Sequence, residues 1–174
     1  MRLLGAILAG GQSRRFGTDK ALATLDGARL IDLVAATLSL QCDGVVVCGR
    51  ADDAFECLPD LPHAGLGPLG GLNAALHHAR AHGFDAVLSS GCDVPNLPRD
   101  LSTQLGGAAA SHAADQPVVG WWCATLAGDC SAFLQSGGRS LYRFAAHVGA
   151  RAVTVRPPLR NINRPVDLAP VGNQ

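Results

Sequence analysis

The residues best suited to phosphate chemistry follow the first apolar run of the chain, in the stretch LAGGQSRRFGTDKAL at positions 8–22. Gly10 and Gly11 carry no Cβ, so their backbone N–H groups can approach a phosphate closely and form a concave anion site. Three cations follow within seven residues: Arg14, Arg15 and Lys20. With one divalent metal ion, three cations balance the roughly four negative charges of a nucleoside triphosphate. This loop is therefore predicted to hold a triphosphate.

Lys20 stands out because it is the only lysine among the 14 lysine and arginine residues of the chain. A compact, rotatable ammonium differs chemically from the planar guanidinium fork of arginine. A single retained lysine therefore indicates a phosphate contact where a guanidinium would not fit. The alternative interpretation is a glycine turn beside a solvated basic surface.

Two other phosphate-binding motifs are excluded. A P-loop requires the pattern GxxxxGK[ST], whereas Lys20 lies between Asp19 and Ala21. The pattern GxGxxG does occur at residues 65–70. However, it follows a proline-rich loop rather than a first strand, and no acidic residue comes about 20 positions later in a strand context. We interpret it as part of a glycine-rich loop.

The elements that must position the first loop alternate between short apolar runs and longer stretches of helical period. Strands are predicted at residues 3–8, 45–48, 86–89, 117–122 and 152–155, and helices at residues 30–40, 69–79, 99–105, 131–135 and 140–147. This alternation is typical of an α/β architecture with a mostly parallel sheet. We expect one domain over residues 1–174, with a surface loop at residues 106–114.

Composition narrows the class of protein. The chain has 174 residues, 48% of them hydrophobic and 16% charged, which favours a compact globule over a disordered chain. Its formal net charge is zero, so no global positive field would hold a nucleic acid. The first apolar run is too short to cross a membrane, and no export signal is evident. We expect a cytoplasmic protein with six reduced cysteines.

In an open α/β sheet, ligands bind at the carboxyl ends of the strands. Asp93 lies just past the strand predicted at residues 86–89, where a carboxylate can reach a metal ion. Carboxylate oxygen is a hard ligand suited to Mg²⁺. The alternative is a turn aspartate before Val94 and Pro95. Asn161 and Asn163 are further oxygen ligands, or loop residues that satisfy their own backbone.

Four motifs in this order identify a resemblance: LAGGQSRRFGTDKAL, GPLGGL at residues 67–72, CDVP at residues 92–95 and NINRPVDL at residues 161–168. Together they resemble the nucleotidyltransferases of molybdenum cofactor biosynthesis, and most closely the molybdenum cofactor guanylyltransferase family. The resemblance covers nearly the whole chain. It implies a three-layer Rossmann-like nucleotidyltransferase fold and transfer of GMP from GTP to the terminal phosphate of molybdopterin, with release of pyrophosphate. It also implies Mg²⁺ as cofactor and transient contact with other cofactor-biosynthesis proteins or apo-molybdoenzymes.

The resemblance assigns roles to residues of this chain. The glycine-rich loop would wrap the triphosphate through Gly10, Gly11, Ser13, Arg15 and Lys20. The family's guanine readers would be the loop that includes Leu8 and Ala9, together with Asp60, which lies eight residues before Pro68. Catalysis would depend on Arg15, Lys20 and Asp93, and the metal would be held by Asp93 and Asn163, with Asn161 close by.

Some positions leave alternatives open. The LAGG sequence at residues 8–11 favours GTP, since cytidylyltransferase relatives tend to carry TAAG. Cys48, however, stands where the family commonly has an asparagine, and a thiol is a poor hydrogen-bond partner. A cytidylyltransferase that uses CTP, or an inactive nucleotide-binding module, are therefore the competing interpretations. The pterin phosphate has four candidate partners among which the sequence does not choose: Arg139, Arg143, Arg156 and Arg160.

Overall fold

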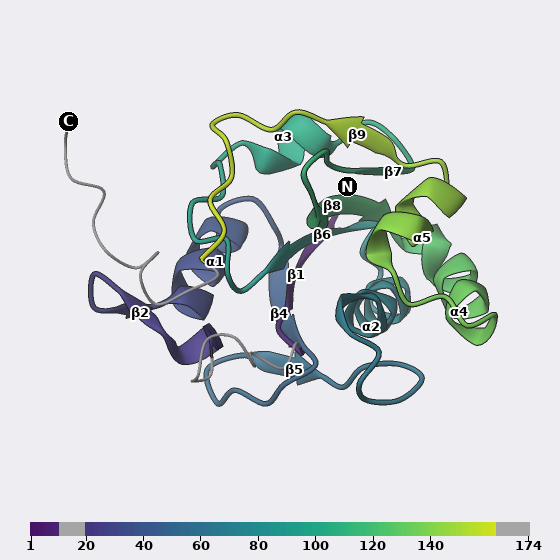
Figure 1. Ribbon diagram of the computed structural model, residues 1–174, viewed down its shortest axis with the longest axis horizontal. Coiled ribbons are helices and arrows are strands. Elements are labelled where there is room, and N and C mark those ends of the chain that lie inside the picture. The colour runs from purple at the N-terminus through teal and green to yellow at the C-terminus, as the bar shows by residue number, and fades with distance from the viewer. Residues whose placement is uncertain (11–19, 163–174) are drawn as a thin grey trace.

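A seven-stranded sheet forms the centre of the computed structural model, which describes residues 1–10 and 20–162 (Figure 1). The strand order is β5-β4-β1-β6-β8-β7-β9. The strands are β1 (Leu3–Leu8), β4 (Gly44–Cys48), β5 (Glu56–Leu58), β6 (Ala86–Gly91), β7 (Ala110–Ala113), β8 (Gln116–Cys123) and β9 (Arg151–Val153). The short strands β2 (Thr24–Leu25) and β3 (Ala28–Arg29) form a separate hairpin.

The sheet changes direction after β6. Strands β5, β4, β1 and β6 run parallel to one another, whereas β8 is antiparallel to both β6 and β7. Because parallel strands end at the same edge, the loops after β1, β4, β5 and β6 all leave the sheet on one side. The mostly parallel α/β architecture expected from the sequence is confirmed.

Helices cover both faces of the sheet and create two cores (Figure 1). The helices are α1 (Leu30–Ser39), α2 (Pro68–Ala81), α3 (Leu101–Leu105), α4 (Ala127–Gln135) and α5 (Leu141–His147), with the 3-10 turns η1 (Lys20–Leu22) and η2 (Ala124–Leu126). Strand side chains alternate between the two cores: Leu4 packs towards α2, α4 and α5, and Ile7 packs towards α1 and α3. Trp122 and Trp121 are divided in the same way, and both are buried.

The helix boundaries have local causes. Gly67 precedes α2 with a φ of 66°, and Pro68 takes the first helical position, where its missing N–H costs no helical hydrogen bond. Ser140 caps α5, because its side chain accepts a hydrogen bond from the Arg143 backbone N–H at 3.3 Å. Within the described part of the chain, no helix combines the length and apolarity that a bilayer crossing requires.

The surface loop expected at residues 106–114 is wrong in its second half. Ala110–Ala113 form β7, which pairs with β8 on one side and β9 on the other. The segment ASHA has a low intrinsic preference for strands, so its conformation comes from pairing with two neighbours. The predicted strands and helices elsewhere match the structure within a few residues, but the short strands β2, β3 and β5 were not predicted.

The six cysteines are all free, as expected. Only Cys48 and Cys130 are fully buried, and the other four are partly exposed. Burial raises the pKa of the Cys130 thiol to about 12, and the neighbouring Asp129 carboxylate adds to this shift. Cys130 therefore acts as a small apolar residue of the core.

The core beneath α5 yields a stability prediction. Phe144 is 0% exposed and lies against the rings of Trp122 and Phe133, with ring centroids 5.8 and 5.6 Å away. Phe144→Ala removes this packing and should lower the free energy of unfolding by about 3–5 kcal/mol. Tyr142→Ala on the same helix is the matched control, since Tyr142 is 63% exposed and should lose less than about 1 kcal/mol. Urea denaturation measures both, and equal losses would contradict this account of the core.

Candidate functional site

A buried carboxylate lies where several strand ends meet. Asp60 is in the loop after β5 and is only 8% exposed. Glycines from three other segments surround it: Gly10 after β1, Gly49 after β4, and Gly70 and Gly71 in the first turn of α2. Leu61 N–H donates to Gly70 O at 3.2 Å and ties the Asp60 loop to that turn. The sheet edge and the helix N-terminus therefore enclose one acidic group.

Gly49 shows how little room this arrangement leaves. Its φ is 82°, a conformation that side chains with a Cβ rarely adopt. A Cβ at this position would lie 2.7 Å from Gly10 Cα and 2.8 Å from Asp60 Oδ1. The loops after β1 and β4 thus approach each other backbone to backbone, and glycine at this position leaves space for the carboxylate.

The Asp60 carboxyl has a raised pKa and an oxygen without a hydrogen-bond partner among the described residues. Burial raises the pKa of the Asp60 carboxyl above its ordinary value, and a hydrogen bond from the Gly65 N–H offsets this only in part. Among the described residues, Asp60 Oδ1 is buried and has no hydrogen-bond partner. An unpaired buried acceptor costs about 1–3 kcal/mol. Such a group is suited to accept hydrogen bonds from a ligand that carries adjacent N–H donors.

Cys48 lies beside this group as the last residue of β4. It is 0% exposed and packs in the core beneath α2. Burial raises the pKa of the Cys48 thiol to about 12, and the charge of Asp60 adds to the shift. The thiol therefore stays protonated near neutral pH and contributes packing rather than strong hydrogen bonds.

Asp93 forms the second part of the site, in the turn after β6. With the Asn161 amide oriented by its partners, its nitrogen donates to Asp93 Oδ2 at 2.7 Å and to Oδ1 at 3.2 Å. Ile162 N–H also donates to Asp93 O at 2.8 Å. The segment at residues 157–162 is thereby bound to the turn, so Asn161 and Ile162, the first two residues of the NINRPVDL motif, contact Asp93 of the CDVP motif.

The donor set at this turn fits a hard cation. The Asp93 carboxylate is a ligand that Mg²⁺ accepts, whereas Asn161 presents its nitrogen to this carboxylate, and Mg²⁺ commonly uses only one or two carboxylates plus substrate phosphates. No group of three or more His, Cys, Asp or Glu residues suited to a metal ion occurs in the described ranges 1–10 and 20–162. An ion held here would therefore depend on substrate oxygen atoms as well as on protein ligands.

The register of the sheet places the Asp60 part and the Asp93 part of the site at the edge where the parallel strands end. Strand β1 pairs with β6 so that Leu8 lies opposite Gly91. Gly10 and Asp93 each follow their strand by two residues, so both leave the sheet at the same edge, on adjacent strands. A ligand that contacts both Asp60 and Asp93 would lie across the carboxyl end of β1, where the nucleotide-binding loop was expected.

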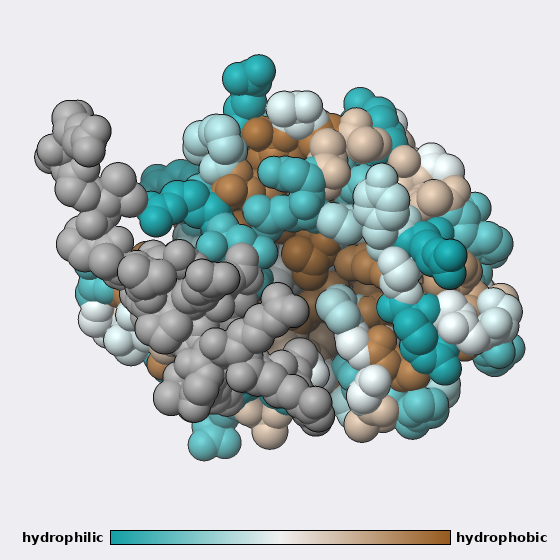
Figure 2. Space-filling view, in the orientation of Figure 1, coloured by the Kyte–Doolittle hydropathy of each residue, from teal (hydrophilic) through white to brown (hydrophobic). Residues whose placement is uncertain are grey.

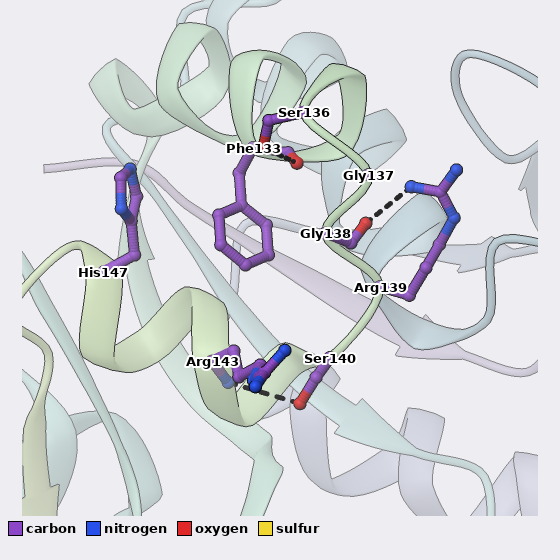
Figure 3. Close-up of a pocket in the computed structure, with 8 residues that line it drawn as sticks. All are labelled: Phe133, Ser136, Gly137, Gly138, Arg139, Ser140, Arg143 and His147. Carbon is purple, nitrogen blue, oxygen red and sulfur yellow. Dashed lines mark hydrogen bonds between the residues drawn. The ribbon is translucent and has the colours of Figure 1, made fainter.

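A cavity of about 620 Å³ lies between α4 and α5 (Figure 3). Its lining includes an aromatic ring, small loop residues and three basic side chains: Phe133, Ser136, Gly137, Gly138, Arg139, Ser140, Arg143 and His147. Arg139 turns back on its own loop, since its Nη1 donates to Leu134 O at 2.9 Å and to Gly138 O at 2.7 Å. Arg143 is exposed and lies at the start of α5.

This cavity lies towards the same edge of the sheet. Ala124 N–H, just before α4, donates to Asp85 O at the opposite edge, where β6 begins. Further along α4, Ser131 Oγ contacts Asn73 at 3.1 Å and His77 at 2.8 Å. Helix α4 therefore runs antiparallel to α2, and its end points towards the edge with Asp60. Figure 2 shows a hollow bordered by hydrophobic side chains on this face, with hydrophilic side chains on the right, over α4 and α5.

The structure brings several predicted site residues together. Gly10 lies beside the glycine-lined Asp60, Leu8 and Ala9 lie against Cys48 at the end of β4, and Asp93 lies with Asn161. Lys20 begins the turn η1. Four predicted residues lie outside the described residues: Gly11, Ser13, Arg15 and Asn163.

Two features of the site were missed. Gly49 was not singled out, although it directly follows a predicted strand at its carboxyl end, which is the signal that could have found it. The α4–α5 cavity had no such signal, because only the packing of the two helices places Phe133 beside His147, with ring centroids 5.3 Å apart. Among the four arginines left open, Arg139 and Arg143 line this cavity.

Comparison with known proteins places these features in a family context. Residues 5–156 match the family model described as the MobA-like NTP transferase domain. A molybdenum cofactor guanylyltransferase of Acidiphilium cryptum is 40% identical, over 95% of this chain and 92% of the relative. A molybdenum cofactor guanylyltransferase of Rhodobacter capsulatus is 37% identical, over 97% of this chain and 94% of the relative.

Solved structures share the fold. The molybdopterin-guanine dinucleotide biosynthesis protein A of Archaeoglobus fulgidus superposes with a TM-score of 0.72 at 22% identity, over 97% of this chain and 95% of that one. The Mycobacterium tuberculosis protein Rv0371C, solved as a complex with manganese, has a TM-score of 0.62 at 15% identity, with 96% of each chain covered. At these identities the likeness extends to the fold alone.

The burial of Asp60 predicts that its carboxylate lowers the stability of the ligand-free protein. Because its pKa is raised in the folded protein, the free energy of unfolding falls as pH rises from the ordinary pKa of an aspartate, about 4, through the folded value. Asp60→Asn removes this cost, so at pH 7 we expect the ligand-free variant to be about 1 kcal/mol more stable, a few degrees in Tm. The gain should vanish below about pH 4.

Differential scanning calorimetry from pH 4 to 8 measures this effect. Asp115→Asn, at an exposed turn position, is the control and should leave Tm unchanged. A lower Tm for Asp60→Asn at pH 7 would show that the carboxylate stabilises the ligand-free fold, contrary to the argument from its unpaired oxygen.

Proposed function

Because the chain belongs to the MobA-like NTP transferase family and is thus a nucleotidyltransferase, we propose that it transfers GMP from GTP to the terminal phosphate of molybdopterin, releasing pyrophosphate. The product would be molybdopterin guanine dinucleotide. The observation that carries the choice of base is the buried Asp60 carboxylate with its unpaired Oδ1.

The chemistry of the bases supports guanine. Guanine presents two adjacent donors, N1–H and the 2-amino group, which one carboxylate can accept together. Cytosine presents one donor beside two acceptors, and the acceptors would face the negative charge of Asp60. The surrounding glycines let the edge of a base approach through backbone groups, and Cys48 offers no competing polar contact.

The mechanism requires positioning rather than an activated side-chain nucleophile. A phosphate monoester is already nucleophilic at neutral pH, so its oxygen can attack the α-phosphorus directly while the bond to pyrophosphate breaks. The protein must hold two anions together and neutralise charge in the transition state. Gly10, Gly11, Ser13, Arg15 and Lys20 are proposed to hold the triphosphate.

Asp93 is proposed to hold Mg²⁺, with the amide oxygen of Asn163 as a further ligand. The Asn161 nitrogen donates to both carboxylate oxygens of Asp93 and so orients this carboxylate at the edge of the sheet. When bound, Mg²⁺ would neutralise phosphate charge and help to orient the triphosphate. The role proposed for Asp93 is to fix the position of the bound ion relative to the strand ends.

The α4–α5 cavity is proposed to hold the molybdopterin substrate. Its position towards the same edge leaves room for the acceptor beside the nucleotide, and its arginines suit a phosphate group. Phe133 adds an apolar ring surface for a flat heterocycle. Arg139 already donates to two carbonyl groups, so Arg143 is the side chain better placed to meet a phosphate.

The reaction itself is tested by pyrophosphate release in the presence of molybdopterin and Mg²⁺. GTP should support turnover, whereas CTP and ATP should support it at least about tenfold less well, because each lacks the pair of donors that Asp60 accepts. Preferential turnover of CTP would favour a cytidylyltransferase, and no turnover with any nucleotide would favour an inactive binding module.

Asp93→Ala is the variant that links this assay to the proposed site. It should lower turnover by roughly 10²–10³-fold, the usual cost of removing one electrostatic contact of the transition state. Its Tm should stay within a few degrees of the wild type, since Asp93 is only partly buried. Unchanged turnover would remove Asp93 from the mechanism.

Arg143→Ala tests the acceptor site separately. Loss of one charge-assisted contact with a phosphate should raise the KM for molybdopterin about tenfold and leave the KM for GTP within twofold. Arg80→Ala, which removes an exposed arginine from the last turn of α2, is the matched control. Steady-state kinetics with each substrate varied in turn measures both, and equal effects of the two variants would exclude the cavity as the acceptor site.

A further inference from the structure

Asn73 is a polar residue in the buried part of α2. It is 2% exposed, and its neighbours Leu72 and Ala74 belong to the core. A buried amide is costly unless it is hydrogen-bonded. Asn73 meets this requirement with two segments outside its own helix: Nδ2 donates to Leu61 O at 3.3 Å, and Oδ1 accepts from Ser131 Oγ at 3.1 Å.

The first of these contacts bears on Asp60. Leu61 directly follows Asp60, and both of its backbone groups are bound to α2: its N–H donates to Gly70 O at 3.2 Å, and its C=O accepts from Asn73. The Leu61 side chain is 37% exposed, so it has only partial burial to hold this part of the loop. Two hydrogen bonds to α2 therefore fix the backbone from which the Asp60 carboxyl projects.

The second contact binds the oxygen of the Asn73 amide to α4. The Ser131 hydroxyl has one hydrogen, which it donates to Asn73 Oδ1, so its oxygen accepts from His77 Nε2 at 2.8 Å. With Oδ1 directed to α4, the Asn73 nitrogen is directed to Leu61. Ser131 and His77 thus lie on the oxygen side of the amide, whereas Nδ2 alone contacts the Asp60 loop.

We infer that Asn73 is a positioning residue for base selection, which holds the Asp60 carboxylate in place through the Leu61 carbonyl. The inference rests on the proposed function, in which Asp60 accepts two hydrogen bonds from guanine. A carboxylate must be well placed to accept both, so a looser loop weakens the contact that distinguishes guanine from bases with fewer donors. The chemistry at the phosphates, which depends on Asp93, is unaffected.

The test compares GTP with inosine triphosphate, whose base lacks the 2-amino group but keeps N1–H. Wild-type protein should prefer GTP in kcat/KM. Asn73→Ala should lower this preference about fivefold to tenfold, chiefly by raising the KM for GTP, and leave kcat within twofold. Asn73→Leu should do the same, and it fills the buried volume so that the fold is retained if alanine is too small.

Ser131→Ala is the matched control, since it removes the contact with α4, whereas the Leu61 carbonyl can only accept and so keeps Nδ2 directed to the Asp60 loop. It should change the preference for GTP less than twofold. If Asn73→Ala and Asn73→Leu both fold and keep the full preference, Asn73 has only a structural role and the inference is wrong.

Asp60→Asn separates this outcome from failure of the proposed function. If Asp60→Asn abolishes the preference for GTP and the Asn73 variants do not change it, base reading by Asp60 stands and the inference alone fails. If Asp60→Asn keeps the preference, Asp60 does not read the base, and both are overturned. In the supporting case, Asn73→Ala lowers the preference in wild-type protein and has no further effect when combined with Asp60→Asn.

Discussion

The close approach of the loops after β1 and β4 around one buried carboxylate is the constraint on which the site depends. Gly10 and Gly49 meet backbone to backbone, and a Cβ on Gly49 would come within 2.8 Å of Asp60 Oδ1. The first turn of α2 closes the other side through Gly70. Such an arrangement places an acceptor of hydrogen bonds where water has little access, so its unpaired oxygen is costly to the fold and available to a ligand. The Asp60 carboxylate thus lies at a position where its charge is expected to lower the free energy of unfolding of the ligand-free protein.

The change of strand direction after β6 divides the sheet into two parts, which carry different parts of the proposed site. On one side, four parallel strands end at one edge and present the proposed nucleotide contacts. On the other side, β8 returns antiparallel, and η2 and α4 carry the chain back towards the same edge. The α4–α5 cavity with its arginines therefore lies towards the edge that carries the strand-end loops. Transfer between two anionic substrates requires such an arrangement, because both must be held while their mutual repulsion is neutralised.

Two amides beside the site connect its loops to distant segments of the chain. Asn73 joins the loop of Asp60 to α4, and Asn161 joins the C-terminal segment to the turn of Asp93. In each case an amide connects segments far apart in the chain, and its donor and acceptor can serve two partners at once. The apolar cores on the two sheet faces give the fold its stability, while these amides set the position of individual loops.

The amino-acid sequence by itself determined the alternation of strands and helices, the glycine-rich loop after β1, and the placement of Asp93 at a strand end, because hydrophobic period and turn residues are local properties. It also contained the four motifs on which the family resemblance depends. Only the tertiary structure decided that Ala110–Ala113 form a strand, since two neighbouring strands impose that conformation on a weak sequence. The same holds for the contact of Asn161 with Asp93, the cavity beside Phe133 and the position of Gly49 against Asp60. Each joins residues distant in the chain, and their proximity follows from packing, which no local pattern encodes.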